Sequence, residues 1–401
     1  MTHPRVIYWN SQPSPYVVER FNAVAANGNV QLEAWFDKER DPDRSWDVDP
    51  GQWEFPASYL PKARIGSMIL PFPDRELRSR RPDVLITPMD RMAGVAAALV
   101  GRVISRRVAS RTLPVFETWV KKTVRSESAN HFLYRAIDGA KVSGSDAAAM
   151  ASHYGLPADR TWRVTQSINL DLYAKARDLS GTEREKRRRE FGLQGCVFVY
   201  VGRLDHSKGL EYLLRGFRRL ESEDCDASLL VLGDGPDEVE IRAMADGLTK
   251  VHFAGFVQPR MLPPFYGLAD VFVFPTLGDP NGLVVEEAMA AGLPVISTEN
   301  AGDIRSRIRN GETGFVVPPF DPEALAFAMR TLAGDAALRS AMSRSVMQVA
   351  EGYAMDRYAD DFDRFISGVL AMPSRRNPCA FAARALGVVL LRVARPISEG
   401  T

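Results

Sequence analysis

Short apolar runs alternate with longer stretches of helical periodicity along almost the whole chain, and this alternation limits the fold more than any other feature. Such runs are typical of strands buried on both faces of a parallel sheet, and the longer stretches supply the crossover helices. The pattern predicts an α/β fold. In the first half the predicted strands are residues 5–9, 31–36, 83–87, 113–117 and 140–144, and in the second half they are 197–202, 228–233, 251–255, 271–275, 293–297 and 314–317.

The chain has 401 residues, which is long for one core and suits two domains. A basic, polar segment at 175–193 separates the two series of strands. We therefore predict an N-terminal domain over 1–174, a C-terminal domain over 175–370 and a basic tail over 371–401. Each domain is expected to be a Rossmann-like, doubly wound parallel sheet. Ligands of such sheets bind at the carboxyl ends of the strands, and here also in a cleft between the domains.

Bulk composition excludes several classes of protein. The 51 Lys and Arg residues balance 50 Asp and Glu, so net charge gives no reason to expect a nucleic-acid partner. Three cysteines lie far apart, without metal-ligand or disulfide spacing, and the short acidic pairs read as solvated loops. No apolar run suits a signal peptide or a membrane-crossing helix. We expect a cytoplasmic protein without a metal site.

Two cations follow the strand predicted at 197–202. Arg203 and Lys208 lie in "RLDHSKG", before a segment of helical spacing that begins at Leu210. Positive side chains beside the free amides at a helix start suit a diphosphate. Two solvated loop charges are an equally good interpretation of these residues taken alone.

A second strand, turn and helix occur in "ADVFVFPTLGDPNGLVVEEAMAA". Asp279 and Gly282 belong to the turn, and Glu286 and Glu287 fall in the first helical turn, where the helix dipole favours carboxylates. This arrangement also predicts an anion site. The segment "LGDGP" lacks the third glycine of a dinucleotide fingerprint and reads as a turn and helix cap. Phe256 and Val257 follow another strand, where they could present backbone groups to a nucleobase.

Six ordered motifs together resemble a known family. "VGRLDHSKG", "LGDGP", "FAGFV", "YGLADVFVFPT", "DPNGLVVEEAMAAGLPVI" and "NGETGFVV" follow the order and spacing of the family 4 glycosyltransferases of GT-B fold. The resemblance is strong over residues 195–320 and weaker in the first half. It implies two Rossmann-like domains that face each other across a cleft.

The family's acid, seven residues, acid motif is similar to Asp279 and Glu287. The resemblance implies that Asp279 contacts the sugar and that Glu287 contacts the ribose, since a carboxylate accepts hydrogen bonds from vicinal hydroxyls. Amides at the start of the helix would meet the phosphates: Gly282, Leu283 and Val284. The first acid is usually Glu rather than Asp, and Asn281 stands where an aromatic residue is common. These departures bear on the identity of the sugar.

The same resemblance implies a retaining, metal-independent transfer of a hexose-type sugar, by front-face attack in which the leaving phosphate helps to deprotonate the acceptor. Arg203 and Lys208 would stabilise the departing diphosphate. The expected partners are a nucleotide-diphosphate sugar and a glycan or lipid-linked acceptor in polysaccharide biosynthesis, with no cofactor. A nucleotide-sugar epimerase of the same fold and a catalytically silent binding scaffold are the alternatives.

The first half offers fewer candidates. Relatives have a glycine pair after the first strand, whereas this chain has "NSQPSPY", so Ser14 and Tyr16 are the residues expected where donor and acceptor meet. Glu117, at the end of the strand predicted at 113–117, is the candidate for the position where many relatives have a histidine. A structural strand-end carboxylate is the alternative interpretation of Glu117.

Two basic segments suggest contact with a membrane. Seven cations between residues 102 and 125 could serve an acceptor at a membrane, or could be favourable charges at a helix C-terminus. In the tail, Arg384, Arg392 and Arg395 project within about 80° on a helical wheel that is otherwise apolar. A helix over 379–396 could lie on anionic lipid or could pack back onto the N-terminal domain.

Overall fold

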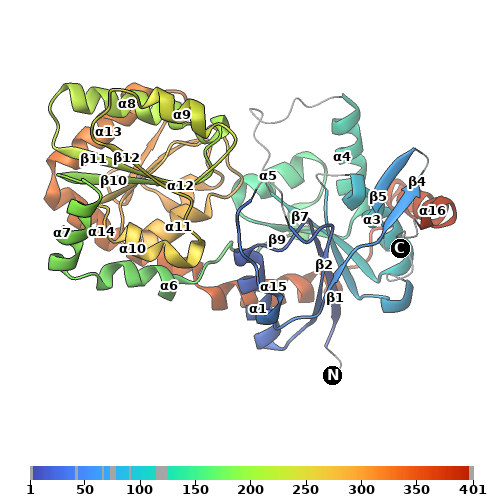
Figure 1. The fold of residues 1–401 in the computed structure, drawn as a ribbon. Coiled ribbons are helices and arrows are strands. Elements are labelled where there is room, and N and C mark those ends of the chain that lie inside the picture. Colours follow the sequence, from blue (N-terminus) through green and yellow to red (C-terminus); the bar gives the residue numbers. More distant parts are fainter. Residues whose placement is uncertain are drawn as a thin grey trace, which may run out of the picture. The chain divides into compact units, whose positions relative to one another are not determined.

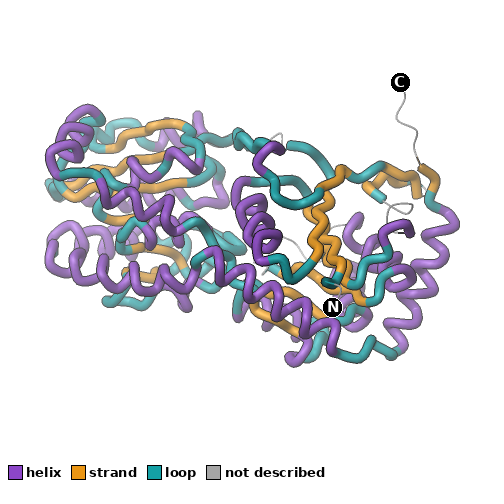
Figure 2. The backbone as a smooth tube through the Cα atoms, turned by 90° about the horizontal axis from the view of Figure 1, so that it is seen from below, coloured by secondary structure: helices purple, strands orange, loops and turns teal. Residues whose placement is uncertain are grey.

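The computed structural model describes residues 3–40, 44–65, 67–72, 78–89, 92–113 and 124–396. Among them, the chain forms two compact units. Unit 1 contains the described residues before 114 together with 124–165 and 355–396, and unit 2 contains 166–354. In Figure 2 the strands of each unit, drawn in orange, run between purple helices. The α/β prediction is confirmed for both units.

Unit 1 is built on a seven-stranded parallel sheet in the order β3-β2-β1-β6-β7-β8-β9. Its strands are β1 (Arg5–Asn10), β2 (Gln31–Phe36), β3 (Ala57–Tyr59), β6 (Val84–Pro88), β7 (Arg107–Thr112), β8 (Gly139–Val142) and β9 (Thr161–Arg163). A small antiparallel sheet joins β4 (Lys62–Ile65), β5 (Met68–Pro71) and β16 (Arg395–Pro396). The helices are α1 (Pro15–Asn27), α3 (Met92–Ile104), α4 (Val124–Ala136), α5 (Ser145–His153), α15 (Met355–Ala371) and α16 (Pro378–Val393).

Side chains of β1 alternate between two helical layers. Val6 and Tyr8 pack in the core that α1 and α15 cover, whereas Ile7 and Trp9 pack in the core under α3. Because successive side chains of a strand point to opposite faces, burial of both sets makes the strand a continuous apolar run. This is the pattern that the sequence predicted for residues 5–9.

One strand of unit 1 was not predicted from the sequence. It is β7 at Arg107–Thr112, which lies between β6 and β8. Of the strand predicted at 113–117, Leu113 is not in a strand and residues 114–117 lie outside the described part of the chain. The segment "RVASRT" does not look like a buried strand in the sequence, because most of its residues are small or polar. The Ser110 and Thr112 hydroxyls are satisfied by each other, and Thr112 is also bonded to the Tyr134 hydroxyl. The cations counted between 102 and 125 therefore include strand residues, not only a helix C-terminus.

The division into units differs from the predicted boundaries at residues 174 and 370. Residues 166–174 group with unit 2, and α15 groups with unit 1. The reason is burial: Phe362, Phe365 and Val369 of α15 are fully covered in the core against the sheet of unit 1. Hydrophobic contact with that sheet outweighs sequence proximity to unit 2.

Unit 2 has a six-stranded parallel sheet in the order β12-β11-β10-β13-β14-β15. The strands are β10 (Cys196–Val201), β11 (Ala227–Leu232), β12 (Val251–Gly255), β13 (Val271–Phe274), β14 (Val295–Thr298) and β15 (Gly314–Val317). The helices are α6 (Leu170–Ala174), α7 (Gly181–Glu190), α8 (Leu210–Ser222), α9 (Glu238–Met244), α10 (Pro263–Tyr266), α11 (Leu283–Ala290), α12 (Ile304–Arg307), α13 (Pro322–Gly334) and α14 (Ala336–Ala350). Figure 1 shows α8, α9 and α13 on one side of this sheet and α10 and α11 on the other.

The strand order of unit 2 reverses between β10 and β13. These neighbours are parallel, and the chain leaves β10 toward α8 but leaves β13 toward α11. In an open α/β sheet, loops that diverge from adjacent strands leave a crevice at the carboxyl edge, where ligands bind. The residues predicted to carry chemistry in the second half follow these two strands.

Candidate functional site

The loop after β10 is held against the loop after β13 by backbone contacts. The amide of Leu277 donates to the carbonyl of Ser207 at 2.8 Å. Gly209 has φ +70°, and a Cβ there would lie 2.1 Å from the carbonyl oxygen of Pro275. Only glycine fits both the left-handed backbone and this close approach. The glycine of "HSKG" therefore brings the two loops together.

Lys208 and Asp279 meet at this junction. The Lys208 Nζ lies 2.8 Å from the Asp279 Oδ2, and both side chains are mostly buried, with exposed fractions of 13% and 19%. The Asp279 Oδ1 accepts hydrogen bonds from the amides of Asn281 and Gly282, at 2.9 and 2.7 Å. Burial alone raises the pKa of Asp279, but Lys208 and the two amides outweigh it and hold that pKa below its usual value. The carboxylate is therefore ionised at neutral pH.

Arg203 belongs to the same loop. Its Nε lies 3.7 Å from the Asp205 Oδ2, and its carbonyl accepts a 2.8 Å hydrogen bond from the Tyr200 hydroxyl. Asp205 also caps the short helical turn His206–Lys208 through the amide of Ser207. Local polar contacts thus set the course of the chain from Arg203 to Lys208.

The glycines of "LGDGP" have a packing role. Gly233 and Gly235 are so close to the loop after β10 that an added Cβ would lie 1.8 Å from the Gly202 carbonyl oxygen or 2.3 Å from that of Leu204. Helix α9 begins three residues after Gly235. The interpretation as a turn before a helix agrees with this geometry. The two glycines let this turn pack closely against the loop after β10.

Gly282 starts α11 in a left-handed conformation with φ +59°. A Cβ there would lie 2.5 Å from the ring of Phe274. Its amide already donates to Asp279, so of the three amides predicted for phosphates this one has a partner within the chain. Leu283 and Val284 are the first two residues of α11, where amides lack an intrahelical partner.

Glu287 is completely buried. Its Oε1 accepts a 3.0 Å hydrogen bond from the Tyr173 hydroxyl, and its Oε2 accepts a 2.7 Å hydrogen bond from the Tyr266 hydroxyl. Sequence reasoning missed both tyrosines because they lie 114 and 21 residues from Glu287, and a local pattern does not relate residues so far apart. Glu287 has no exposed surface, so a ligand could contact its carboxylate only if groups that cover it moved.

Arg307 is the other residue that sequence reasoning missed. It is buried and ion-paired with Glu286 at 2.8 Å, and it donates to the carbonyl of Asn281 at 2.7 Å. A signal for it exists in the sequence: Arg307 follows the buried Ile304 by three residues, so the two lie on the same face of α12. Arg307 thereby supports the loop that carries Asp279.

The other predicted residues belong to other loops and helices, or lie outside the described part of the chain. Phe256 and Val257 directly follow β12 and are half-buried. In unit 1, Ser14 caps α1 by accepting a hydrogen bond from the Val17 amide at 3.4 Å, and Tyr16 contacts Trp46 edge to face. Glu117 lies outside the described residues.

One group of possible metal ligands occurs among the described residues. Glu127 and His131 on α4 and His153 on α5 each offer a ligand atom, all within 4.8 Å of one another. The geometry also suits a simpler ion pair, since the His153 Nε2 lies 3.8 Å from the Glu127 Oε2. This group belongs to unit 1, whereas the Lys208–Asp279 pair belongs to unit 2.

Residues 195–335 match the family model for glycosyl transferases group 1. Over this range, about a third of its length, the chain is similar to that family. The matched range contains both loops of the junction, with Arg203, Lys208 and Asp279, and it also contains Glu287 and Arg307. The resemblance stated from the six motifs is thereby confirmed.

Similar proteins agree with this assignment. An uncharacterised glycosyltransferase of Methanocaldococcus jannaschii is 31% identical over 57% of this chain and 59% of its own length. A D-inositol 3-phosphate glycosyltransferase of Corynebacterium glutamicum is 32% identical over 50% of each chain. The chain thus spans between half and three-fifths of these relatives. The structure of Anabaena HepE bound to UDP matches 91% of this chain and all of its own, with a TM-score of 0.75 and 15% identity. The two chains therefore share a fold, which is of the GT-B type.

Proposed function

We propose that the protein transfers a sugar, with retention of anomeric configuration, from a nucleotide-diphosphate sugar to a glycan or lipid-linked acceptor. The observation that carries the proposal is the Lys208–Asp279 ion pair at the point where the strand order of unit 2 reverses. An ammonium group and an ionised carboxylate side by side suit a ligand that carries both anionic phosphates and sugar hydroxyls.

The donor would bind in unit 2, with its diphosphate near Arg203 and Lys208. The free amides at the start of α11 add donors for the same phosphates. Asp279 would accept hydrogen bonds from sugar hydroxyls, and Glu287 from the ribose. Phe256 and Val257 would border the nucleobase. The match to Anabaena HepE, which has been solved with UDP and with UDP-glucose, favours a uridine nucleotide as the first donor to test.

The reaction would break the bond between the anomeric carbon and the diphosphate oxygen, and the electron pair would leave with the diphosphate. The acceptor hydroxyl would attack from the same face and pass its proton to the leaving phosphate. Arg203 and Lys208 would stabilise the negative charge that develops on the diphosphate. Fixed charges of this kind are usually the largest contribution to lowering a barrier. No step requires a metal ion.

The acceptor would bind in unit 1, near Ser14 and Tyr16 at the end of β1, and Glu117 remains the candidate for assisting the reacting hydroxyl. We propose a role in polysaccharide or glycolipid biosynthesis at the cytoplasmic face of a membrane. Among the described residues, no helix is both long and apolar enough to cross a bilayer. A surface contact would be the form of membrane association that this fold offers.

The first experiment is a thermal-shift comparison of UDP, GDP and ADP and their glucose conjugates. A ligand that binds only the native state raises stability by RT ln(1 + [L]/Kd), so one nucleotide should stand out. The second incubates the protein with that donor, radiolabelled, and with membrane and polysaccharide fractions. Labelled product with the anomeric configuration of the donor, assigned by proton NMR, supports the proposal.

The same assay separates the alternatives. An isomerised sugar formed from donor alone would indicate an epimerase. Tight donor binding with no turnover against any fraction would indicate a silent scaffold. Inversion of the anomeric centre would overturn the retaining mechanism while leaving the glycosyltransferase assignment in place.

A further inference from the structure

Helix α16 packs on unit 1 through one face. Its buried residues Ala380, Ala383 and Gly387 lie along a single stripe. A Cβ on Gly387 would lie 2.1 Å from the carbonyl oxygen of Leu99, so α16 and α3 pack at close range. Asn377 caps the helix by accepting a hydrogen bond from the amide of Ala380 at 2.8 Å. The alternative in which the tail packs on unit 1 is therefore correct for this face.

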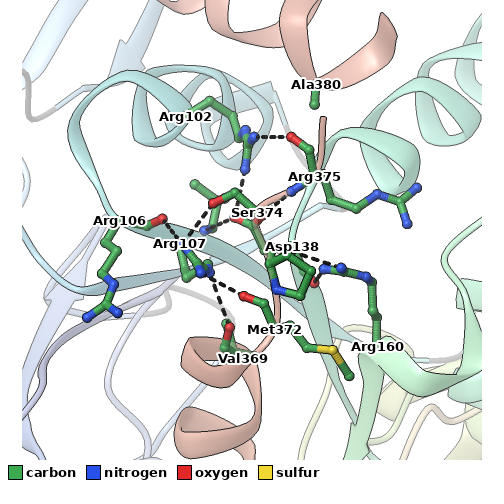
Figure 3. Close-up of polar contacts among 12 residues, drawn as sticks. Arg102, Arg106, Arg107, Asp138, Arg160, Val369, Met372, Ser374, Arg375 and Ala380 are labelled. Atoms are coloured by element: carbon green, nitrogen blue, oxygen red, sulfur yellow. Dashed lines mark hydrogen bonds and ion pairs between the residues drawn. The ribbon is translucent and has the colours of Figure 1, made fainter. Parts of the chain in front are cut away.

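The connection between α15 and α16 is also fastened to the sheet. Buried Asp138 pairs with Arg102 at 2.7 Å and accepts a hydrogen bond from the amide of Arg375 at 3.0 Å. Arg107 and Arg160 donate to carbonyls of the same connection, at Met372 and Pro373. Figure 3 shows these arginines converging on Asp138 and on the segment that leads into α16. The helix is thus held in a defined orientation.

The opposite face of α16 is apolar and exposed. Phe381, Leu386, Val389 and Val393 have exposed fractions of 65%, 47%, 53% and 48%. Phe381, Val389 and Val393 are spaced by multiples of four and form one stripe along the helix with the exposed Ala385, and Leu386 lies beside that stripe. Large exposed apolar side chains are unremarkable singly, but four on one short helix form a patch that marks an interaction surface.

Arginines flank this stripe and no acidic residue interrupts it. Arg384 and Arg392 are exposed on one flank, and the helix sequence "PCAFAARALGVVLLRV" contains no Asp or Glu. Residues 371–401 carry five arginines and one glutamate, a local excess of four positive charges in a chain that is otherwise balanced. An apolar stripe beside a row of cations complements an anionic lipid surface, where apolar groups enter the acyl region and cations stay at the headgroups.

We propose that the outer face of α16 docks unit 1 on an anionic lipid surface while its inner face stays packed on α3. The helix would lie in the plane of the interface and would not cross it. The proposal does not depend on sugar transfer, because lipid binding can be measured without a donor. The proposal also combines the two alternatives given for the tail: the inner face of α16 packs on unit 1, and its outer face binds lipid.

The test uses the full chain and matched double variants. Phe381→Glu with Val389→Glu places two charges on the stripe. Phe327→Glu with Val239→Glu makes the same chemical change at exposed positions of unit 2, where the exposed fractions are 64% and 84%. Binding is measured by sedimentation with vesicles of phosphatidylcholine alone and with added phosphatidylglycerol.

We expect the wild type and the unit 2 variant to bind anionic vesicles and to bind more weakly as salt screens the attraction. The α16 variant should lose at least tenfold in partitioning while keeping its melting temperature. Equal sedimentation of both variants would overturn the proposal, as would a large fall in melting temperature for the α16 variant alone. A concentration-dependent dimer, seen by light scattering and abolished by the α16 variant without any vesicle binding, would overturn it in favour of a second copy.

Discussion

The Lys208 Nζ lies 2.8 Å from the Asp279 Oδ2, although the two residues are 71 positions apart and belong to loops that follow different strands. The donor site that we propose needs a cation for the phosphates and a carboxylate for the sugar hydroxyls. The ion pair holds each of these two groups in place. Such preorganisation lowers the entropy that binding must overcome.

Replacement of Lys208 by Ala should lower kcat/KM by at least about tenfold, or about 1.4 kcal/mol, because a charged hydrogen bond to the diphosphate is lost. Lys186→Ala is the matched control, since Lys186 is exposed and forms only a surface ion pair with Glu190, at 4.0 Å, among the described residues. Steady-state kinetics on both variants measure the difference. An unchanged kcat/KM in a folded Lys208→Ala protein would remove Lys208 from the site.

Asp279 should make stability depend on pH in a defined direction. Its folded pKa is below its unfolded value, so its ionised form stabilises the fold above the unfolded pKa of about 3.9. This contribution is lost as pH falls through the folded pKa. The difference in unfolding free energy between wild type and Asp279→Asn should therefore be largest near neutrality and should shrink below about pH 4. Urea unfolding across pH, with Asp246→Asn as an exposed control, measures it, and a constant difference would contradict the assignment.

Arg307 should contribute to stability and to donor affinity together. Breaking a buried ion pair by removing one partner typically costs about 3–5 kcal/mol, and Arg307→Met would leave Glu286 buried without its charge partner. The loop that carries Asp279 would also lose the bond to the Asn281 carbonyl. We expect a lower melting temperature and a raised Kd for the donor. The double variant Arg307→Met with Glu286→Leu should recover part of the stability, and a simple sum of the two single effects would exclude coupling.

Glu287 can be tested through the ribose. If its carboxylate accepts from the ribose hydroxyls, Glu287→Gln should weaken binding of UDP but leave binding of 2′,3′-dideoxy-UDP nearly unchanged. Tyr266→Phe should destabilise the fold by about 1–3 kcal/mol, because a buried carboxylate oxygen loses its donor. Calorimetric titration of both ligands gives the coupling energy. Equal losses for both ligands would mean that Glu287 acts only through its tyrosine contacts.

Chelation should leave sugar transfer intact. The proposed reaction places no metal in unit 2, and the group of possible ligands, Glu127, His131 and His153, belongs to unit 1. We expect full activity after treatment with EDTA and dialysis. Recovery of activity only on addition of magnesium or manganese would contradict the proposal, and His131→Ala would then show whether this group holds the metal.

Much of the fold follows from local sequence. Strands such as Cys196–Val201 and Ala227–Leu232 are buried at every position, so their apolar runs identify them without any tertiary knowledge. The strand Arg107–Thr112 could not be found in this way. Its polar residues are satisfied by groups that are distant in sequence, such as the Tyr134 hydroxyl, and a local pattern carries no record of such partners.

The sequence by itself determined the α/β class and the positions of Arg203, Lys208 and Asp279 after strands, because strand periodicity and turn chemistry act over a few residues. Only the tertiary structure decided which of these groups meet. The parallel pairing of β10 with β13 brings Lys208 to Asp279, and the fold encloses Glu287 between Tyr173 and Tyr266. It also decided that α16 has one packed and one exposed apolar face. Local spacing is compatible with several sets of contacts, and long-range packing selects one of them. Burial then affects the ionisation state of each group and its accessibility to a ligand.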